Sequence, residues 1–248
     1  SRILQYELSS TDNPLCADLK RDIVTASINH PAGLAVSTLL RSHFAGKREK
    51  DEGLPAPLRK ILEKCCQGAT DAALYAKNVI MAWNSAIYYV DRAWFRTNLI
   101  PLLDWDKDPQ VATSAWQGLL RSGHPYNPLV EDIKNLLLNT VSHYDQLGST
   151  STSFCVLALR TRFFKLAKIG TATFRKFFDS FPLHGYEELT HVLHRTQADT
   201  MNPRKGEKGD PKFWDKYIKP FFLELWPNRP NIITEKVSQE IISLISES

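Results

Sequence analysis

The sequence has few of the residues that supply reactive or metal-binding chemistry. Its 248 residues include only four cysteines, and no two of these form a C-x-x-C pair. Cys65 and Cys66 are adjacent, which is a poor geometry for a metal clip or an ordinary disulfide. Cys16, Cys65 and Cys155 fall among apolar positions of expected helices, where a free thiol packs as a small hydrophobic group. The sequence therefore predicts unreactive thiols and a reducing, cytoplasmic environment.

Long hydrophobic runs are also lacking. The chain contains no run of about 18 apolar residues and no basic-then-apolar leader, so we expect no membrane span and no secretory signal. The net charge is only +4 and charged residues make up 23% of the chain, which argues against disorder and against a strongly basic protein. Hydrophobic residues make up 43%, enough to bury a core. We expect a folded, soluble protein without a membrane partner.

Complete catalytic motifs are lacking as well. The chain has no G-x-S-x-G motif, and its short glycine–lysine stretches do not have the spacing of a phosphate-binding loop. Metal-ligand spacing occurs once, at Glu187, Glu188, His191 and His194. A second ligating helix is missing, so we interpret these four residues as a solvated helix face. We predict that the chain is not an enzyme and that it holds no cofactor and no metal.

Helix starts are the clearest local signal that is present. An oxygen-bearing cap precedes proline at Asn13-Pro14, Asp108-Pro109, Asn127-Pro128 and Asp210-Pro211. The side chain of the cap accepts from a free amide of the first turn, and proline there loses only an idle donor. The helical period of apolar residues predicts helices over 14–26, 31–44, 58–67, 70–90, 91–103, 109–122, 128–146, 152–168, 171–181, 186–200, 211–225 and 234–246. Tyr88–Val90 also fit a strand, but a lone strand would have no partner.

About a dozen short-linked helices predict an all-α fold. A compact bundle and a stack of helix pairs both remain open, and we favour stacked antiparallel helix pairs, a degenerate α-solenoid without a clean sequence repeat. We expect one helical-repeat-like domain over residues 1–248, because domain boundaries are faint: the most linker-like stretch is 202–210, and 148–153 is the next candidate. Both ends of the sequence run into apolar segments. We therefore expect the chain to be a fragment of a longer protein.

Positive charge is concentrated in one part of the sequence. Between Cys155 and Pro220 there are 13 Lys and Arg against 7 Asp and Glu, whereas the other residues include 18 basic and 20 acidic side chains. Six bases occur there with no acid between them: Arg160, Arg162, Lys165, Lys168, Arg175 and Lys176. Such a cluster is able to hold phosphates with salt-dependent affinity. We favour a partner-facing or merely solvated basic surface, and nucleic-acid binding is the alternative interpretation.

Phenylalanines are interleaved with these bases, at Phe163, Phe164, Phe174, Phe177 and Phe178. At helical spacing we interpret them as core residues rather than as platforms for base stacking, because stacking aromatics usually lie on exposed sheets or grooves.

Three further stretches carry packing motifs. Ile28–Gly33 is followed by Leu39-Leu40, Leu103–Asp106 leads into Ala115–Leu120, and Leu225–Arg229 comes later. Within them, His30, Pro31 and Gly33 predict a tight turn between two antiparallel helices. Trp105 precedes the Asp108 cap, and Trp116 with Gly118 fits a close helix crossing in which a large residue meets a small one.

Together these stretches resemble the large helical region that follows sirtuin-like NAD-consuming domains in certain bacterial antiphage defence proteins. The resemblance spans most of residues 14–240. It implies a non-catalytic scaffold that acts as a sensor, interaction or assembly module. Its partner would be a phage component, a neighbouring domain or another protomer, with oligomers formed through the parent protein. NAD consumption would belong to a separate domain. The alternative function is a basic helical-repeat module that binds nucleic acid.

Overall fold

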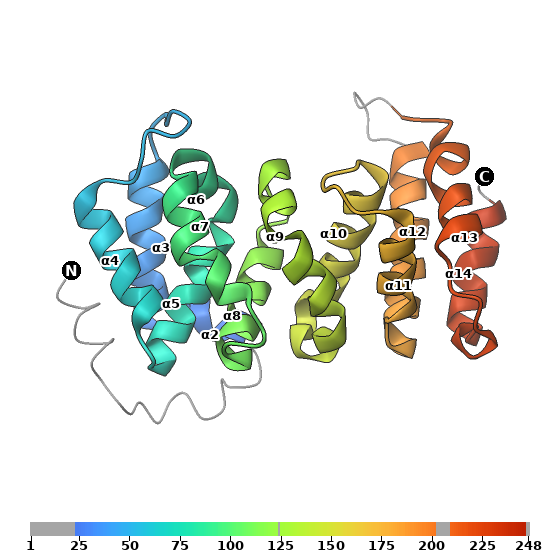
Figure 1. The fold of residues 1–248 in the computed structure, drawn as a ribbon, viewed down its shortest axis with the longest axis horizontal. Helices are drawn as coiled ribbons and strands as arrows, with labels where there is room; N and C mark the ends of the chain where they lie inside the picture. The colour runs from blue at the N-terminus through green and yellow to red at the C-terminus, as the bar shows by residue number, and fades with distance from the viewer. Residues whose placement is uncertain (1–22, 124, 202–208, 247–248) are drawn as a thin grey trace. The chain divides into compact units, whose positions relative to one another are not determined.

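The regular structure of the described residues is helical throughout. The computed structural model describes residues 23–123, 125–201 and 209–246, and within these ranges about a dozen helices follow one another without a strand (Figure 1). The predicted all-α fold class is confirmed, and the alternative of a strand at Tyr88–Val90 is wrong, because a helix covers that segment. The predicted helix start at Asn13-Pro14, and Cys16, lie outside the described residues.

Contacts divide the described chain into two compact units. The first contains the described residues up to Leu136 together with Gln146–Thr150, and the second contains Leu137–Asp145 and the described residues from Ser151 onward. The sequence predicts a single domain over residues 1–248. This stays a prediction, because the division into two contact units does not decide the number of domains.

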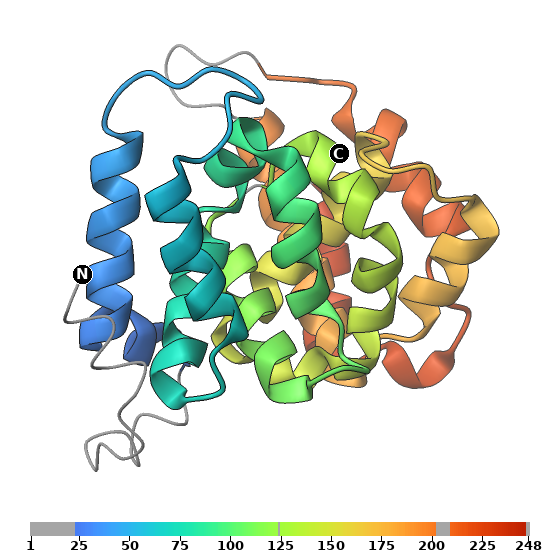
Figure 2. The same ribbon diagram turned by 60° about the vertical axis from the view of Figure 1, so that its left-hand side comes forward.

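The helices that begin in the first unit run from blue to green in Figure 2. They are α2 (Ile23–Asn29), α3 (Pro31–Phe44), α4 (Ala56–Gln67), α5 (Asp71–Ala82), α6 (Asn84–Val90), α7 (Arg92–Asn98), a 3-10 helix (Ile100–Leu103), α8 (Pro109–Arg121) and α9 (Asn127–Thr140). Helix α5 is the central one: residues 72–81 are all buried, and α2, α3, α4 and α8 pack against it.

Helices α5 and α8 make the most extensive helix–helix contact among the described residues of the first unit. Ser114 Oγ donates to the carbonyl of Leu74 over 2.7 Å, and Asn78 Nδ2 donates to the carbonyl of Ser114 over 2.9 Å. Gly118 lies against the backbone of Asn78. Trp116 is fully buried, and its indole Nε1 donates to the carbonyl of Leu103 over 2.9 Å. The two hydrogen bonds between Ser114, Leu74 and Asn78 therefore fix how the two helices face each other.

A corner joins α2 to α3. His30 is the N-cap of α3: its Nδ1 accepts from the amide of Ala32 over 3.2 Å, and Pro31 is the first helical residue. A Cβ at Gly33 would lie 1.8 Å from the carbonyl oxygen of Ser27, so only glycine fits there. The two helices are bent by 71° relative to each other, which corrects the predicted antiparallel hairpin. The break between α2 and α3 lies where the sequence predicts it, but the chain turns a corner there instead of reversing direction.

None of the individual helices in the described ranges has the length and hydropathy of a membrane span; α2 and α3 meet those two criteria only as a bent pair.

The second unit has an aromatic core. Its elements are α10 (Ser151–Phe163), α11 (Thr171–Asp179), α12 (Leu183–Met201), a π-helix (Trp214–Ile218), α13 (Lys219–Glu224), a 3-10 helix (Pro230–Ile232) and α14 (Glu235–Ser246). Phe174, Phe177 and Phe178 are buried, and the ring of Phe178 contacts that of Phe221 edge to face with centroids 5.0 Å apart. The interpretation of these three phenylalanines as core residues is confirmed.

Two predicted helix ends are corrected by the structure. The helix expected over 128–146 ends at Thr140 and continues as a 3-10 helix, Val141–Thr150. The helix expected to start at Pro211 begins two residues later: the side chain of Asp210 accepts from the amide of Lys212, which forms a capped turn ahead of the helix.

Candidate nucleic-acid interface

The six bases predicted as a binding patch, here called the basic cluster, occupy adjoining segments of the second unit. Arg160 and Arg162 lie in the last turn of α10, Lys165 and Lys168 in the segment that follows, and Arg175 and Lys176 on α11. Lys165, Lys168, Arg175 and Lys176 are exposed, whereas Arg160 and Arg162 are half-buried. The structure therefore places the cluster on one helix–loop–helix segment.

Glu224, at the end of α13, partly neutralises the cluster. Arg162 Nη2 lies 2.8 Å from Glu224 Oε2, and Arg175 Nε donates to the carbonyl of Glu224 over 2.9 Å. The sequence alone does not predict this ion pair, because Glu224 is 62 residues from Arg162. Lys165 and Lys176 make no ion pair with a carboxylate among the described residues. Lys165 and Lys176 are thus more available to a ligand than Arg162 and Arg175.

Lys165 occupies an unusual backbone position. Its φ is +51°, in the left-handed region that favours glycine. The amide of Phe164 donates to the carbonyl of Arg160, and the amide of Leu166 donates to that of Thr161, which closes the end of α10. This turn ends the helix at Phe163, five residues before the predicted end at Lys168. It also places Phe164 and Lys165 together at the surface.

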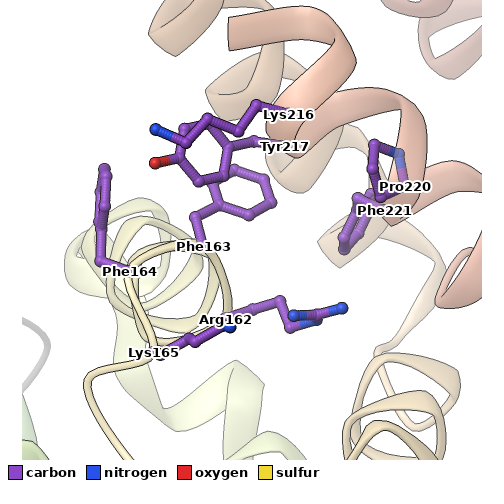
Figure 3. Close-up of a pocket in the computed structure, with 8 residues that line it drawn as sticks. All are labelled: Arg162, Phe163, Phe164, Lys165, Lys216, Tyr217, Pro220 and Phe221. Carbon is purple, nitrogen blue, oxygen red and sulfur yellow. The ribbon is translucent and has the colours of Figure 1, made fainter.

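A cavity of about 450 Å³ adjoins the cluster. It is lined by the end of α10, by the π-helix and by the first turn of α13: Arg162, Phe163, Phe164, Lys165, Lys216, Tyr217, Pro220 and Phe221. In the view of Figure 3, Lys216 and Tyr217 lie on one side, Arg162 and Lys165 on the other, with Phe163 between them. This set of residues is here called the aromatic pocket. Its volume lies within the range of roughly 300–1,000 Å³ that is typical of ligand sites.

Aromatic rings form much of the wall of this pocket. The ring centroid of Tyr217 lies 5.4 Å from that of Phe163 and 5.6 Å from that of Phe164. Phe163 is half-buried, but 47% of Phe164 is exposed. The guanidinium of Arg160 lies 5.5 Å from the centroid of the Phe164 ring, and burial lowers the pKa of this arginine. Phe164 therefore differs from the core phenylalanines and leaves ring surface open to a ligand.

Lys216 brings a third cation to the pocket from the opposite segment. Its Nζ lies 4.7 Å from the centroid of the Tyr217 ring and 3.8 Å from Asp210 Oδ2. Sequence reasoning missed Lys216 and Tyr217 as site residues, although both lie inside the stretch with the excess of basic residues. The sequence signal that could have identified them is the neighbouring lysine and tyrosine at 216–217, which resembles the Phe164-Lys165 pair.

The predicted solvated face of α12 is instead part of a helix–helix contact. His191 Nδ1 and His194 Nδ1 lie 3.0 Å and 2.7 Å from the two carboxylate oxygens of Glu240 on α14. Glu188 accepts from Ser151 and Thr152, on α10. Among the described residues, no group of three or more His, Cys, Asp or Glu side chains is arranged for a metal ion. The Glu and His residues therefore join α12 to its neighbours.

Glu240→Gln should weaken the contact between α12 and α14. Burial alone would raise the pKa of Glu240, but hydrogen bonds from the two histidines offset it and hold the pKa below its usual value of 4.5. Stability from such a carboxylate is present above the pKa of the unfolded chain and is lost as pH falls through the folded pKa. We expect a loss of about 1 kcal/mol at about pH 7 that shrinks toward about pH 3.

Urea denaturation of the wild type and the Glu240→Gln variant at both pH values measures this difference. Asp199→Asn, which removes an exposed carboxylate from α12, is the control and should change the unfolding free energy by less than about 0.5 kcal/mol. A Glu240→Gln effect that is the same at both pH values would contradict the assignment.

A second cavity, of about 380 Å³, lies in the first unit beside Lys77. Only 1% of Lys77 is exposed, and its Nζ donates to the carbonyl of Gly68, the C-cap of α4, over 2.5 Å. Burial lowers the pKa of this lysine. Asp104 and Asp108 line the same cavity, so it carries both signs of charge. We interpret Lys77 as a structural group, because its ammonium completes the carbonyl end of α4.

The described cysteines are free thiols. Cys65 and Cys155 are buried and Cys66 is half-buried. Burial raises the pKa of Cys65 to about 11 and that of Cys155 to about 12. Because the thiolate is the reactive form, both are poor nucleophiles at neutral pH.

Comparison with known proteins identifies no relative of this chain: no family model, no curated protein and no solved structure matches it.

Proposed function

We propose that this chain is a non-catalytic helical module that binds nucleic acid through the basic cluster and the aromatic pocket. The observation that carries the proposal is that cations and aromatic rings line the same pocket. Lysine and arginine side chains neutralise phosphates, and aromatic rings offer surfaces on which bases stack. A merely solvated basic surface would not need a half-exposed phenylalanine in its midst.

The exposed lysines supply most of the expected attraction. Arg162 is paired with the carboxylate of Glu224, so a phosphate would have to compete for it. Lys165 and Lys176 make no such pair among the described residues, and their side chains are exposed. Phosphate contacts that come mainly from exposed lysines give an affinity that falls steeply as salt rises.

Replacing three lysines of the cluster by glutamate tests this proposal. In the Lys165→Glu, Lys168→Glu, Lys176→Glu variant we expect the affinity for labelled DNA and RNA oligonucleotides to fall about 10-fold or more. We also expect the slope of log affinity against log salt to become shallower by about three, because each lost phosphate contact removes about one. Fluorescence anisotropy over a series of salt concentrations measures both quantities.

The matched control carries the same charge change in the first unit, at the exposed residues Lys47, Lys50 and Lys60. It should bind far more tightly than the cluster variant at every salt concentration. Equal losses in the two variants would show that only net charge matters and would overturn the proposal, as would a wild-type chain that binds neither DNA nor RNA.

The place of this module in a larger protein rests on the resemblance alone. The motif residues on which the resemblance depends have structural roles. His30 caps α3, Trp116 donates a hydrogen bond to the carbonyl of Leu103, and Arg229 Nε lies 3.2 Å from Asp179 Oδ1. A role as sensor, interaction or assembly module of an antiphage defence protein, with a phage component, a neighbouring domain or another protomer as its partner, stays a prediction. The cytoplasmic location also stays a prediction.

A further inference from the structure

The aromatic pocket offers a base-sized surface as well as cations. Phe164 is the most exposed phenylalanine of the wall: 47% of it is exposed, whereas Phe221 is buried and Phe163 is half-buried. The guanidinium of Arg160 lies over its ring, 5.5 Å from the centroid, so a base would stack on the other face. Exposed aromatic rings beside cations are the usual platforms for unpaired bases, because every base has a π-face. The pocket therefore suits a ligand that carries flat rings and negative charge together.

Two lysines line the pocket, where they can contact the phosphates of a bound strand. Lys165 follows Phe164 directly, and the left-handed turn at Lys165 fixes the two residues next to each other at the end of α10. Lys216 lines the same pocket from the π-helix, beside the ring of Tyr217, and is exposed. Its ion pair with Asp210 is longer, at 3.8 Å, than the 2.8 Å pair of Arg162 with Glu224. A strand whose base stacks on Phe164 would thus have a lysine from each of the two lining segments near its phosphates.

A duplex cannot use this arrangement. Its bases are already stacked and paired inside the helix, so a ring at the protein surface has no open base face to contact. Single strands expose their bases at little cost, and base–aromatic stacking then adds to the attraction of the phosphates. The concave, ring-lined shape of the pocket favours the single strand for the same reason.

We infer that the aromatic pocket selects single-stranded nucleic acid by stacking one unpaired base on Phe164, with Lys165 and Lys216 holding the flanking phosphates. This inference rests on the proposed function and narrows it, because the basic cluster alone would attract duplex and single strand alike. The sequence interpretation of the phenylalanines as core residues does not extend to Phe164, whose ring is only half covered.

The experiment compares a labelled single-stranded oligothymidylate with a duplex of equal length, bound by the wild type and three variants. Phe164→Leu keeps an apolar side chain but removes the π-face. Lys165→Gly removes a cation while giving the left-handed position the residue that it favours, so the fold is retained. Tyr89→Leu, at an exposed aromatic residue of the first unit, is the control. Thermal melting of each variant checks its folding.

We expect the wild type to bind the single strand about 10-fold or more tightly than the duplex. Phe164→Leu should lower single-strand affinity by about 5-fold or more and leave duplex affinity unchanged. A single strand that contains 2-aminopurine should change its fluorescence on binding to the wild type but much less with Phe164→Leu. Lys165→Gly should make the salt slope shallower by about one for both ligands, and Tyr89→Leu should change neither.

Equal wild-type affinity for the two ligands, together with an unchanged Phe164→Leu variant, would overturn the inference. If Lys165→Gly still weakened both ligands in that case, the proposed function would stand without the single-strand preference. Binding that does not depend on salt, or that Lys165→Gly leaves unchanged, would overturn the proposed function and the inference with it.

Discussion

Replacing Trp116 by alanine should lower the free energy of unfolding by about 3–5 kcal/mol. The indole is fully buried on α8, and its Nε1 donates to the carbonyl of Leu103. Alanine would leave a cavity beside the 3-10 helix Ile100–Leu103 and a buried carbonyl without its partner, and both effects destabilise the fold. Urea denaturation followed by far-ultraviolet circular dichroism measures the change.

Trp116→Phe separates these two effects. It keeps most of the ring volume and loses the donor, so we expect it to cost about 1–3 kcal/mol, less than alanine. If Trp116→Ala unfolds at the same urea concentration as the wild type, the packing assigned to Trp116 is wrong.

Gly118→Ala should destabilise the chain by about 2–3 kcal/mol. A Cβ at this position would lie 2.2 Å from the carbonyl oxygen of Asn78 and 2.9 Å from its carbonyl carbon. These are backbone atoms of α5 and cannot rotate away as a side chain can, so the two helices would have to separate. Helix propensity alone predicts the opposite sign, since alanine is favoured over glycine inside a helix by about 1 kcal/mol.

Gly46→Ala is the matched control. No atom lies within 4 Å of the Cβ that it would add, so we expect a change of less than about 0.5 kcal/mol. Stabilisation by Gly118→Ala would mean that propensity decides and that α5 and α8 are not in backbone contact. Thermal and urea denaturation of both variants tell the two cases apart.

Local signals explain how much of the fold the sequence predicts. Asp108 caps α8 as expected, because its carboxylate accepts from the amides of Gln110 and Val111, and that interaction needs no distant partner. The stretch after Thr140 was missed for a different reason. Its buried residues Val141, Tyr144, Leu147 and Thr150 are spaced by three, a period that fits a 3-10 helix and an α-helix almost equally well over a short stretch.

The candidate site was predictable only in part. The six bases of the basic cluster are close together in the sequence, so their grouping could be read directly. Glu224 and Tyr217 contact residues of this segment about 50 to 60 positions away, and Lys216 lines the same pocket; no local pattern reports such contacts. The core role of Phe178 followed from helical spacing, whereas the exposure of Phe164 depends on where α10 ends. That end is set by the turn at Lys165, which helical periodicity does not reveal.

Thermal stability and ligand binding favour different residues at position 165, in the left-handed turn at the end of α10. Glycine is favoured at that backbone conformation, so a search for variants that survive heating should recover Lys165→Gly. A search for variants that hold nucleic acid tightly should keep the lysine. Selection for thermal stability would therefore weaken binding of nucleic acid, and selection for binding would lower thermal stability, at this single position.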